Sequence, residues 1–344
     1  MDDHIINALP DPVILIDAER RIAGSNTATR SLLGTIYKGE DLSLTLRQPD
    51  ILSAVDAVLA GAAIQTEEII FSHPVMRTFE LSVSAIPGSE TAPGDAQVLL
   101  VLHDITATRA AESVRSEFIA NVSHELRSPL VSLIGFLETL QTSAKDDPEA
   151  QERFLSIMGD EASRMRALID DLLSLSKIEA NEHNRPRGQV NLEHVLRTVC
   201  ETLDQKAAHK AMSIDVVCKD PVPDIPGDPQ ELIQVFTNLV ENAVKYGSDD
   251  SAVTVTIERV DRIPDIGDKG VRITVRNFGE TIAPEHLPRL TERFYRIDKG
   301  RSRSVGGTGL GLAIVKHLVN HHRGRLVIES SPENGTLFSV FLRT

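Results

Sequence analysis

The chain of 344 residues is 41% hydrophobic and 25% charged, an ordinary globular composition with room for two or three domains. Its formal net charge of −14 and pI near 5.3 oppose binding to nucleic acid or to anionic membranes, because both would repel an acidic surface. Its partners are therefore expected to be proteins or small ligands.

Neither a signal peptide nor a membrane segment is recognisable in the sequence. The longest fully aliphatic run, residues 98–102, is far shorter than the roughly 20 apolar residues that a membrane helix needs. We expect a cytoplasmic chain, with any membrane association supplied by a missing segment or by a partner. The two cysteines, Cys200 and Cys218, form no close-spaced metal or redox motif and are expected to be inert thiols.

Residues 1–108 are predicted to form a first domain of about five antiparallel strands and a few helices. Strands are expected at residues 12–17 and 21–25, followed by a short helix at 26–33 that ends at Gly34. Further strands are expected at residues 64–71, 76–86 and 97–104. This order, which closes on D-I-T at 104–106, resembles a PAS sensory domain, whose α/β fold is implied here.

The signal that this domain senses, a ligand or a protein, is unknown from the sequence. It contains no cysteine, which excludes flavin-adduct chemistry, and His4, His73 and His103 have no setting typical of a haem ligand. The alternative is a small domain without a ligand that serves only for dimer contact.

A long amphipathic helix is predicted from about residue 108 to 143. Its apolar residues form two lines: Ile119, Leu126, Leu133 and Leu140 repeat every seven positions, and Val122, Leu130 and Leu137 fill the second line. In this register His124 lies on the face away from a helical partner, so we expect it to be exposed, with Ser128 one turn later on the same face. Pro129 removes an amide donor and predicts a bend or loosened turn nearby.

A second helix is predicted at residues 149–180, after a turn at 145–148, and a polar linker at 181–188. Its seven-residue lines are Met158, Met165 and Leu172, and Leu155, Ala162 and Ile169. Two helices of about 30 residues, each roughly 45 Å long, cannot bury these stripes alone. We therefore predict that residues 109–183 form a hairpin that pairs with a second copy in a homodimeric four-helix bundle. The alternative is a single-chain coiled hairpin.

The stretch F-I-A-N-V-S-H-E-L-R-S-P-L at residues 118–130 resembles the phospho-acceptor box of the sensor histidine kinases of two-component systems. The resemblance implies that His124 is phosphorylated by ATP and that Glu125 is its general base. It also implies that Ser128 helps to position the water that dephosphorylates the partner. The family has Thr or Asn at this last position, and serine lacks the methyl group that would fix the rotamer.

Residues 184–344 show an α+β pattern, and a helix begins after Asp228 and Pro229, a favourable N-cap and first position. Its core face is predicted to contain Leu232, Val235, Phe236, Leu239 and Ala243. The segment N-L-V-E-N-A-V-K-Y at 238–246 resembles the N box of the same kinases, in which the second asparagine, here Asn242, holds Mg²⁺.

The adenine-binding motif is expected after a strand at residues 271–276. The family has Asp-x-Gly-x-Gly there, whereas this chain has Asn277, Gly279 and Thr281. An asparagine oxygen can still accept from the adenine amino group. Thr281 would be excluded by a positive φ or by a close approach of the backbone to the nucleotide.

A glycine-rich turn at residues 306–312, G-G-T-G-L-G-L, precedes an amphipathic helix. Free amides and the helix dipole at such a turn bind phosphate. The segment 292–296 resembles the F box, residues 299–304 are expected to form a lid over the phosphates, and strands are predicted at 326–329 and 335–341. The residues expected to bind nucleotide are Asn238, Asn242, Lys245, Tyr246, Asn277, Gly279, Arg293, Gly307, Gly309, Leu310, Gly311 and Thr336.

The resemblance covers nearly all of residues 108–344 and implies a multidomain α+β protein. Its parts would be a PAS-like α/β sensor, a dimeric four-helix-bundle hairpin and an α/β sandwich ATP-binding domain of the Bergerat type. We predict an ATP:protein-histidine phosphotransferase that requires Mg²⁺, passes its phosphoryl group to an aspartate of a response regulator and also dephosphorylates that regulator. The sequence of these motifs is most similar to that of the phosphate-starvation sensor kinases. The alternatives are a catalytically impaired nucleotide-binding scaffold and a hydrolytic ATPase of the gyrase and chaperone superfamily.

Overall fold

The computed structural model describes residues 3–72, 75–87, 97–181, 186, 188–297 and 307–344. The predicted lid at 299–304, Gly306 and most of the predicted linker at 181–188 lie outside the described residues. The chain divides into two compact units, Met1–Ile119 and Ala120–Thr344, which are described separately.

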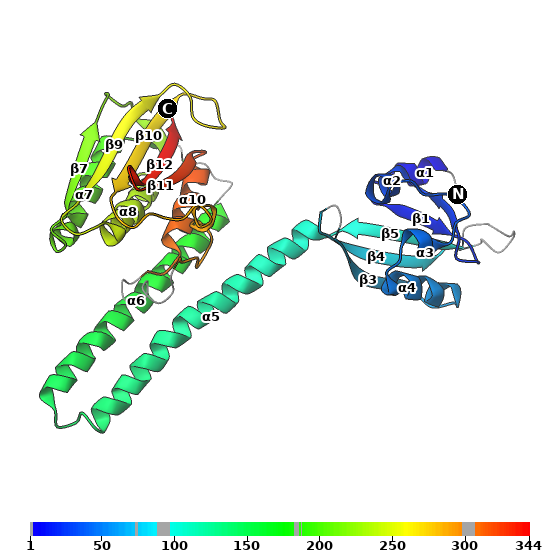
Figure 1. The fold of residues 1–344 in the computed structure, drawn as a ribbon, viewed down its shortest axis with the longest axis horizontal. Coiled ribbons are helices and arrows are strands. Elements are labelled where there is room, and N and C mark those ends of the chain that lie inside the picture. Colours follow the sequence, from blue (N-terminus) through cyan, green and yellow to red (C-terminus); the bar gives the residue numbers. More distant parts are fainter. Residues whose placement is uncertain (1–2, 73–74, 88–96, 182–185, 187, 298–306) are drawn as a thin grey trace. The chain divides into compact units, whose positions relative to one another are not determined.

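The first unit contains one antiparallel sheet in the order β2-β1-β5-β4-β3 (Figure 1). Its strands are β1 (Val13–Ile16), β2 (Ile22–Ser25), β3 (Gln65–Phe71), β4 (Arg77–Ala85) and β5 (Val98–Asp104). Its helices are α1 (Asp3–Asn7), α2 (Thr27–Leu33), α3 (Leu42–Thr45) and α4 (Pro49–Leu59). The five predicted strands are confirmed, as is the helix that ends at Gly34, where φ is 83°.

The main core of this unit lies between the sheet and helices α3 and α4. Alternate residues of β4, Phe79, Leu81 and Val83, are buried against Ile51 and other apolar residues of α4. On the other face of the sheet, a smaller cluster joins Ile6 of α1, Val13 and Leu15. The sheet is therefore covered on both faces by short helices.

The start of helix α5 (Thr106–Gln141) is fixed to the sheet by side chains. The Thr106 amide donates to Asp104 Oδ1 at 3.0 Å, and the Thr78 amide of β4 donates to Thr106 Oγ1 at 2.9 Å. Arg109, in the first turn, forms an ion pair with Glu68 of β3. The first turn of α5 therefore touches two strands of the sheet.

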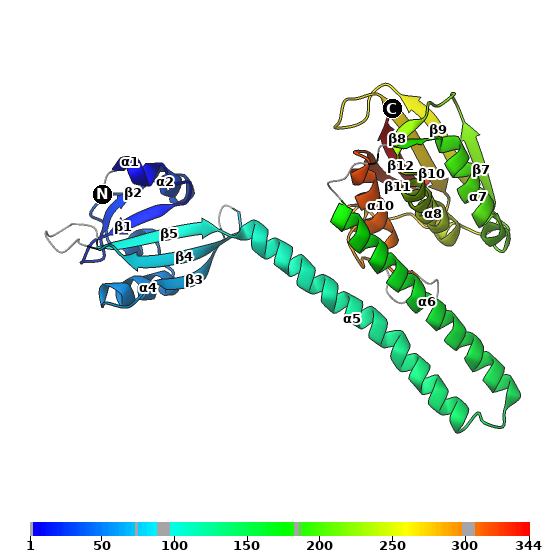
Figure 2. The same ribbon diagram turned by 180° about the vertical axis from the view of Figure 1, so that it is seen from behind.

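The predicted long helices are α5 and α6 (Pro148–Asn181), which form a hairpin in the second unit (Figure 2). Helix α5 continues through Pro129 without an interruption, so the predicted bend stays a prediction. His124 is exposed, as its register predicts. Large apolar side chains on the two helices are also exposed: Ile119, Leu130, Ile134, Leu137, Leu155, Ile169 and Leu173.

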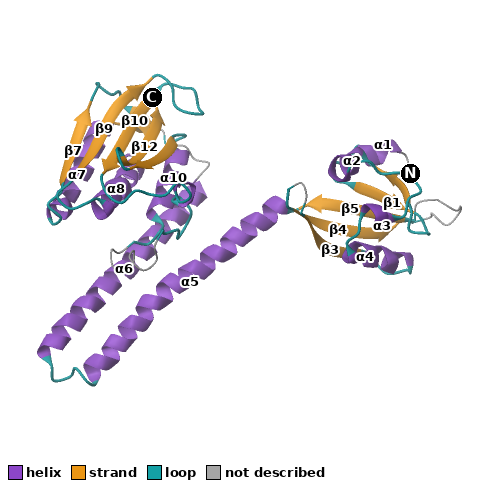
Figure 3. Cartoon of the chain, viewed as in Figure 1, coloured by secondary structure: helices purple, strands orange, loops and turns teal. Residues whose placement is uncertain are grey.

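The C-terminal part of the second unit contains a mixed sheet in the order β11-β12-β10-β9-β7, in which only β7 and β9 pair in parallel (Figure 3). The strands are β7 (Ser213–Cys218), β9 (Ala252–Val260), β10 (Gly270–Asn277), β11 (Arg325–Ser331) and β12 (Gly335–Arg343). The helices are α7 (Leu192–Ala208), α8 (Pro229–Tyr246), η1 (Leu287–Arg289) and α10 (Gly311–His321). A two-stranded sheet pairs β6 (Gly188–Val190) with β8 (Ile225–Gly227).

Helix α8 is the central helix of this part and contacts α7, α10 and β10. Asp228 caps it by accepting from the Gln230 and Glu231 amides, as predicted. The five predicted core residues of α8 have no exposed side-chain surface: Leu232, Val235, Phe236, Leu239 and Ala243. The opposite face of α8 therefore remains for polar contacts.

Glu231, His321 and His322 bring possible metal-ligating atoms within 4.8 Å of one another. Both ring nitrogens of His322 are used by the backbone, however: Nε2 accepts from the Asp228 amide at 3.1 Å and Nδ1 donates to the Leu318 carbonyl at 2.9 Å. Burial also lowers the pKa of His322, which favours the neutral ring. This histidine joins α10 to the start of α8, which is a structural role.

In the part of the chain that the structure describes, no helix combines the length and the apolar character needed to cross a membrane. Burial raises the pKa of the Cys200 thiol to about 11, which agrees with the prediction of an inert thiol.

Candidate active site

His124 lies on the exposed face of α5, close to the middle of that helix. Together with Arg127, Ser128, Val131 and Ser132 it lines an open surface pocket. The predicted one-turn relation of His124 and Ser128 is therefore present, with both side chains accessible from solvent.

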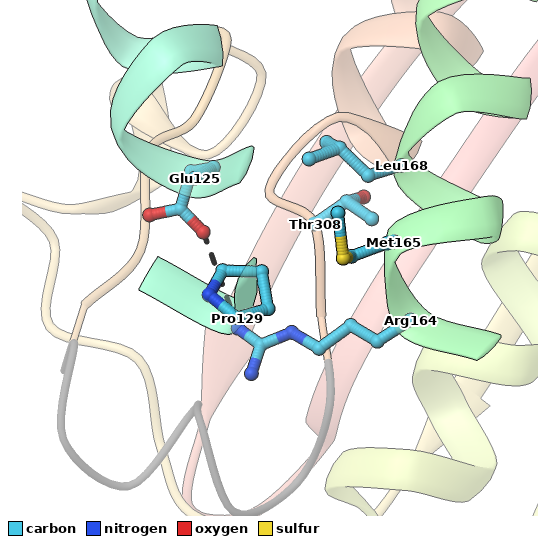
Figure 4. A pocket seen from close by; sticks show the side chains of 6 residues that line it. All are labelled: Glu125, Pro129, Arg164, Met165, Leu168 and Thr308. Atoms are coloured by element: carbon cyan, nitrogen blue, oxygen red, sulfur yellow. Dashed lines mark ion pairs between the residues drawn. The ribbon is translucent and has the colours of Figure 1, made fainter. Parts of the chain in front are cut away.

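Glu125 belongs to a different pocket, which is formed by α5, α6 and the glycine-rich turn. Figure 4 shows Glu125 and Pro129 of α5, Arg164, Met165 and Leu168 of α6, and Thr308 around it. Glu125 Oε2 is 4.0 Å from Arg164 Nη2 and 4.0 Å from Arg296 Nη1. The carboxylate beside His124 thus lies between two guanidinium groups and shares a pocket with the turn expected to bind phosphate.

Lys245, at the end of α8, is close to the same cations. Burial, together with the charges of Arg296 and Arg164, lowers its pKa to about 8, whereas Glu241 opposes the shift. Arg296 is itself nearly buried, with 9% of its side chain exposed. These positive charges repel one another when nothing is bound, and a bound polyanion would offset the repulsion.

The glycine-rich turn lies directly against helix α8. A Cβ atom on Gly307 would lie only 2.6 Å from Lys245 Nζ, and Asn238 Nδ2 donates to the Gly311 carbonyl at 3.4 Å. Gly309 has φ of +72° and packs on the Phe294 backbone, whose amide donates to the Gly309 carbonyl at 2.9 Å. Residues from three separate motifs therefore meet at the N-terminus of α10.

A second group of predicted residues meets at the end of β10. Asn277 is 4% exposed and pairs in register with Thr336 of β12. Thr336 Oγ1 is 2.9 Å from Ser330 Oγ, which accepts from the Ile282 amide at 3.0 Å. Gly279 forms a β-bridge with Gly247, immediately after α8.

Thr281 does not have the positive φ that would exclude a threonine. Its side chain is exposed, and Thr281 does not belong to the described non-glycine residues that have a positive φ. The backbone conformation at this position is therefore open to residues with a Cβ atom. The unusual backbone lies instead at Phe294, where φ is 62° beside Gly309.

Some predicted nucleotide residues have other contacts or limited access. Arg293 forms an ion pair with Glu179 of α6. The Leu310 side chain is fully buried, so only its amide faces the turn, and that amide donates to Thr308 Oγ1 at 3.2 Å. Tyr246 is 51% exposed, with Lys245 Nζ 5.2 Å from its ring centre. Asn242 lies half-buried on α8, one turn after Asn238.

Four residues of this site were not identified from the sequence: Arg164, Arg296, Thr308, and Asp171, whose Oδ2 accepts a hydrogen bond from Thr308 Oγ1. Arg296 and Thr308 lie inside the recognised motifs at 292–296 and 306–312. The charge of Arg296 and the hydroxyl group of Thr308 could therefore have been used to predict them as site residues. Arg164 and Asp171 lie on a helix whose seven-residue pattern was used only to predict packing.

An exposed histidine next to a carboxylate, with a cation-lined glycine-rich turn in the same unit, is the arrangement expected of a phosphotransfer enzyme that uses a nucleotide. Family models agree with this class. Residues 227–344 match the histidine kinase-, DNA gyrase B- and HSP90-like ATPases, residues 114–181 match the His Kinase A (phospho-acceptor) domain, and residues 6–110 match the PAS fold.

Curated relatives give the same result. The phosphate regulon sensor protein PhoR of Pseudomonas aeruginosa is 35% identical over 96% of this chain and 72% of its own length. The sensor protein kinase WalK of Staphylococcus aureus is 35% identical over 99% of this chain and 79% of its own length. The chain therefore belongs to the PAS-containing sensor histidine kinases and is related to PhoR.

The fold agrees with that of a solved histidine kinase. The kinase ThkA, in a crystal structure with the response regulator protein TrrA, aligns with a TM-score of 0.53 and 21% identity, covering 99% of this chain and 98% of ThkA. The predicted multidomain α+β fold and the predicted histidine kinase activity are thus confirmed. The matches favour the kinase over the scaffold alternative, and the phospho-acceptor match at 114–181 is not accounted for by a purely hydrolytic ATPase.

Proposed function

We propose that this kinase phosphorylates His124 with ATP. Glu125 accepts the proton from one ring nitrogen of His124, and the other nitrogen attacks the γ-phosphorus in line, so that a P–N bond forms while the bond to ADP breaks. The observation that carries this proposal is the shared pocket of Glu125 and Thr308, because it brings the acceptor helix and the phosphate turn together. Arg164 and Arg296 would stabilise the charge of the transferring group.

The nucleotide is proposed to lie along α8, with adenine toward Asn277, Gly279 and Thr336. The triphosphate would contact Lys245 and the amides of the turn at Gly307, Gly309, Leu310 and Gly311, with Asn238, Tyr246 and Arg293 at the edge of the site. The half-buried face of α8 that presents Asn238 and Asn242 beside the turn fits a hard cation that keeps most of its waters. Mg²⁺ held by Asn242 would neutralise phosphate charge.

The phosphoryl group is proposed to pass to an aspartate of a response regulator, and Ser128 to assist the reverse dephosphorylation. The solvent-accessible pocket of His124 and Ser128 supports docking of a protein there. The similarity to PhoR supports a role in phosphate-starvation signalling.

A homodimer is proposed through α5 and α6. The phospho-acceptor match at 114–181 and the exposed apolar side chains of both helices support it, because a hairpin of this length needs a second copy to bury them. The domain limits 1–108, 109–183 and 184–344 remain proposals, supported by matches to 6–110, 114–181 and 227–344. Use of ATP, a cytoplasmic metabolite, supports the predicted cytoplasmic location.

The test is autophosphorylation of the full chain with γ-³²P-ATP. Wild type is expected to acquire acid-labile, base-stable label, and His124→Gln is expected to acquire none. His124→Gln with undiminished label of this kind would show that another residue is the acceptor. Binding of a fluorescent ATP analogue to the same variant should stay normal, which separates loss of the acceptor from loss of the nucleotide site.

A further inference from the structure

The ATP-binding part of the chain packs against the last turns of α6. Helix α10 packs against α6, and Leu168, Leu175 and Ile178 on one line of α6 are at most 7% exposed. These residues are buried within a single chain. They are separate from the exposed apolar residues that the proposed homodimer would cover.

Polar contacts surround this apolar line and connect it to functional segments. Gln234 Nε2 of α8 donates to Ser174 Oγ at 2.8 Å, and Arg293 pairs with Glu179. At the centre, Asp171 Oδ2 accepts a hydrogen bond of 2.7 Å from Thr308 Oγ1. This last contact joins α6 to the middle of the glycine-rich turn.

The Thr308 hydroxyl has two partners, and the second one belongs to the proposed phosphate site. Its hydrogen goes to Asp171, while its oxygen accepts from the Leu310 amide at 3.2 Å. That amide stands just before the first turn of α10, where free N–H groups and the helix dipole would otherwise face a phosphate. Asp171 therefore holds Thr308 where it occupies a donor that the nucleotide needs.

We propose that the Asp171–Thr308 contact is autoinhibitory: it holds the Thr308 hydroxyl on the Leu310 amide, where it competes with a phosphate of the nucleotide. The inference rests on the proposed nucleotide site at this turn. A phosphate oxygen at the Leu310 amide must displace Thr308 Oγ1. It must also approach the partly buried Asp171 carboxylate, and two like charges in a poorly hydrated pocket repel each other. By linkage, whatever stabilises the contact weakens nucleotide binding by the same factor.

The test measures binding of a fluorescent ATP analogue, with Mg²⁺, to the full chain. Asp171→Ala removes the acceptor and the charge, and we expect about 3-fold to 10-fold tighter binding, the range for the net contribution of one ordinary hydrogen bond. Asp171→Asn keeps an acceptor of the same shape and should give a smaller increase. Asp170→Ala is the matched control, because Asp170 is the adjacent acid on the exposed side of α6 and should leave the affinity unchanged.

Each outcome separates this proposal from the proposed function. If wild type binds the analogue and Asp171→Ala binds it equally or more weakly, the contact does not compete with nucleotide and the inference is overturned, while the kinase assignment stands. If wild type binds no analogue, the proposed nucleotide site itself fails. Thr308→Val, which removes the hydroxyl but keeps the shape, gives a second measurement should Asp171→Ala fold poorly, and it too must bind more tightly.

Discussion

Lys245 is the residue whose charge depends most on the fold. A lysine in water stays mostly protonated up to about pH 10, whereas burial beside Arg296 and Arg164 lowers the pKa of Lys245 to about 8. Below this pH the ammonium group is present and attracts phosphate as a point charge. Above it, the proposed nucleotide site loses one of its three clustered cations.

The dissociation constant of a fluorescent ATP analogue is therefore expected to be nearly constant up to about pH 8 and to rise above it. The pKa is lowered in the free protein, and a bound triphosphate raises it again, so nucleotide binding takes up a proton above pH 8 and weakens by up to about tenfold per pH unit. Titrations of the full chain between pH 7.5 and 9.5 measure this.

Lys245→Arg is the matched control for this pH dependence. Arginine remains charged throughout this range, so the variant should show a flat profile even if its affinity at pH 7.5 is lower. A slope in the arginine variant equal to that of wild type would assign the pH dependence to another group.

At the residue scale, the sequence predicted side chains that act through local motifs and missed those that act across the fold. Asn238, Lys245 and Gly307 were recognisable because their spacing along the chain carries the chemistry. Arg164 and Arg296 are separated by 132 positions and meet at Glu125 only because α6 carries the ATP-binding part. No periodicity along the chain encodes that meeting.

Among the elements, α5 was the most predictable, because its apolar repeat fixes both its length and the exposed position of His124. The effect of Pro129 was less predictable. A proline favours a kink, but neighbouring hydrogen bonds and packing decide whether one forms, and Pro129 is buried against the pocket of Glu125 and Arg164. The short helices α1, α3 and α4 were not located because their patterns are too brief for a 3.6-residue period to be distinguished.

The first turns of α5 are expected to transmit helix phase from the sheet to His124. Thr106 and Arg109 tie the helix start to β4 and β3, and the helix then runs unbroken to His124. One residue inserted between Ala110 and Val114 would rotate everything after it by about 100°, whereas seven residues would nearly restore the phase. We expect the one-residue insertion to change the ratio of kinase to phosphatase activity. The seven-residue insertion should largely restore that ratio.

The measurement uses purified full chains with a phosphorylatable response regulator, comparing autophosphorylation with the rate of regulator dephosphorylation. Both insertions are made between Ala110 and Val114. Seven residues inserted after Gln141, in the turn of the hairpin, would follow His124 and would not test helix phase. Equal activity ratios for the one-residue and seven-residue insertions would show that control does not depend on helix phase.

On the scale of the whole molecule, the second unit brings an acceptor helix and an ATP-binding part together within one chain. Glu125 shares a pocket with Thr308 and lies 4.0 Å from Arg296 of the same chain. The glycine-rich turn therefore lies on the side of α5 of its own chain. In the proposed homodimer, we expect each ATP-binding domain to phosphorylate His124 of its own chain.

Mixed dimers distinguish this arrangement from transfer between chains. One chain carries His124→Gln with an intact nucleotide site, and the other carries Asn242→Asp, which places a negative charge at the proposed Mg²⁺ and phosphate position but leaves His124 intact. The two chains are co-expressed with different tags, purified through both tags and incubated with γ-³²P-ATP.

Phosphorylation within a chain predicts no label on either one, because no chain has both functional parts. A mixed dimer of wild type and His124→Gln is the control and should be labelled on the wild-type chain alone. Strong label on the Asn242→Asp chain would instead mean that the partner's ATP-binding domain reaches across the dimer, and that the intrachain pocket of Glu125 and Thr308 belongs to a resting state.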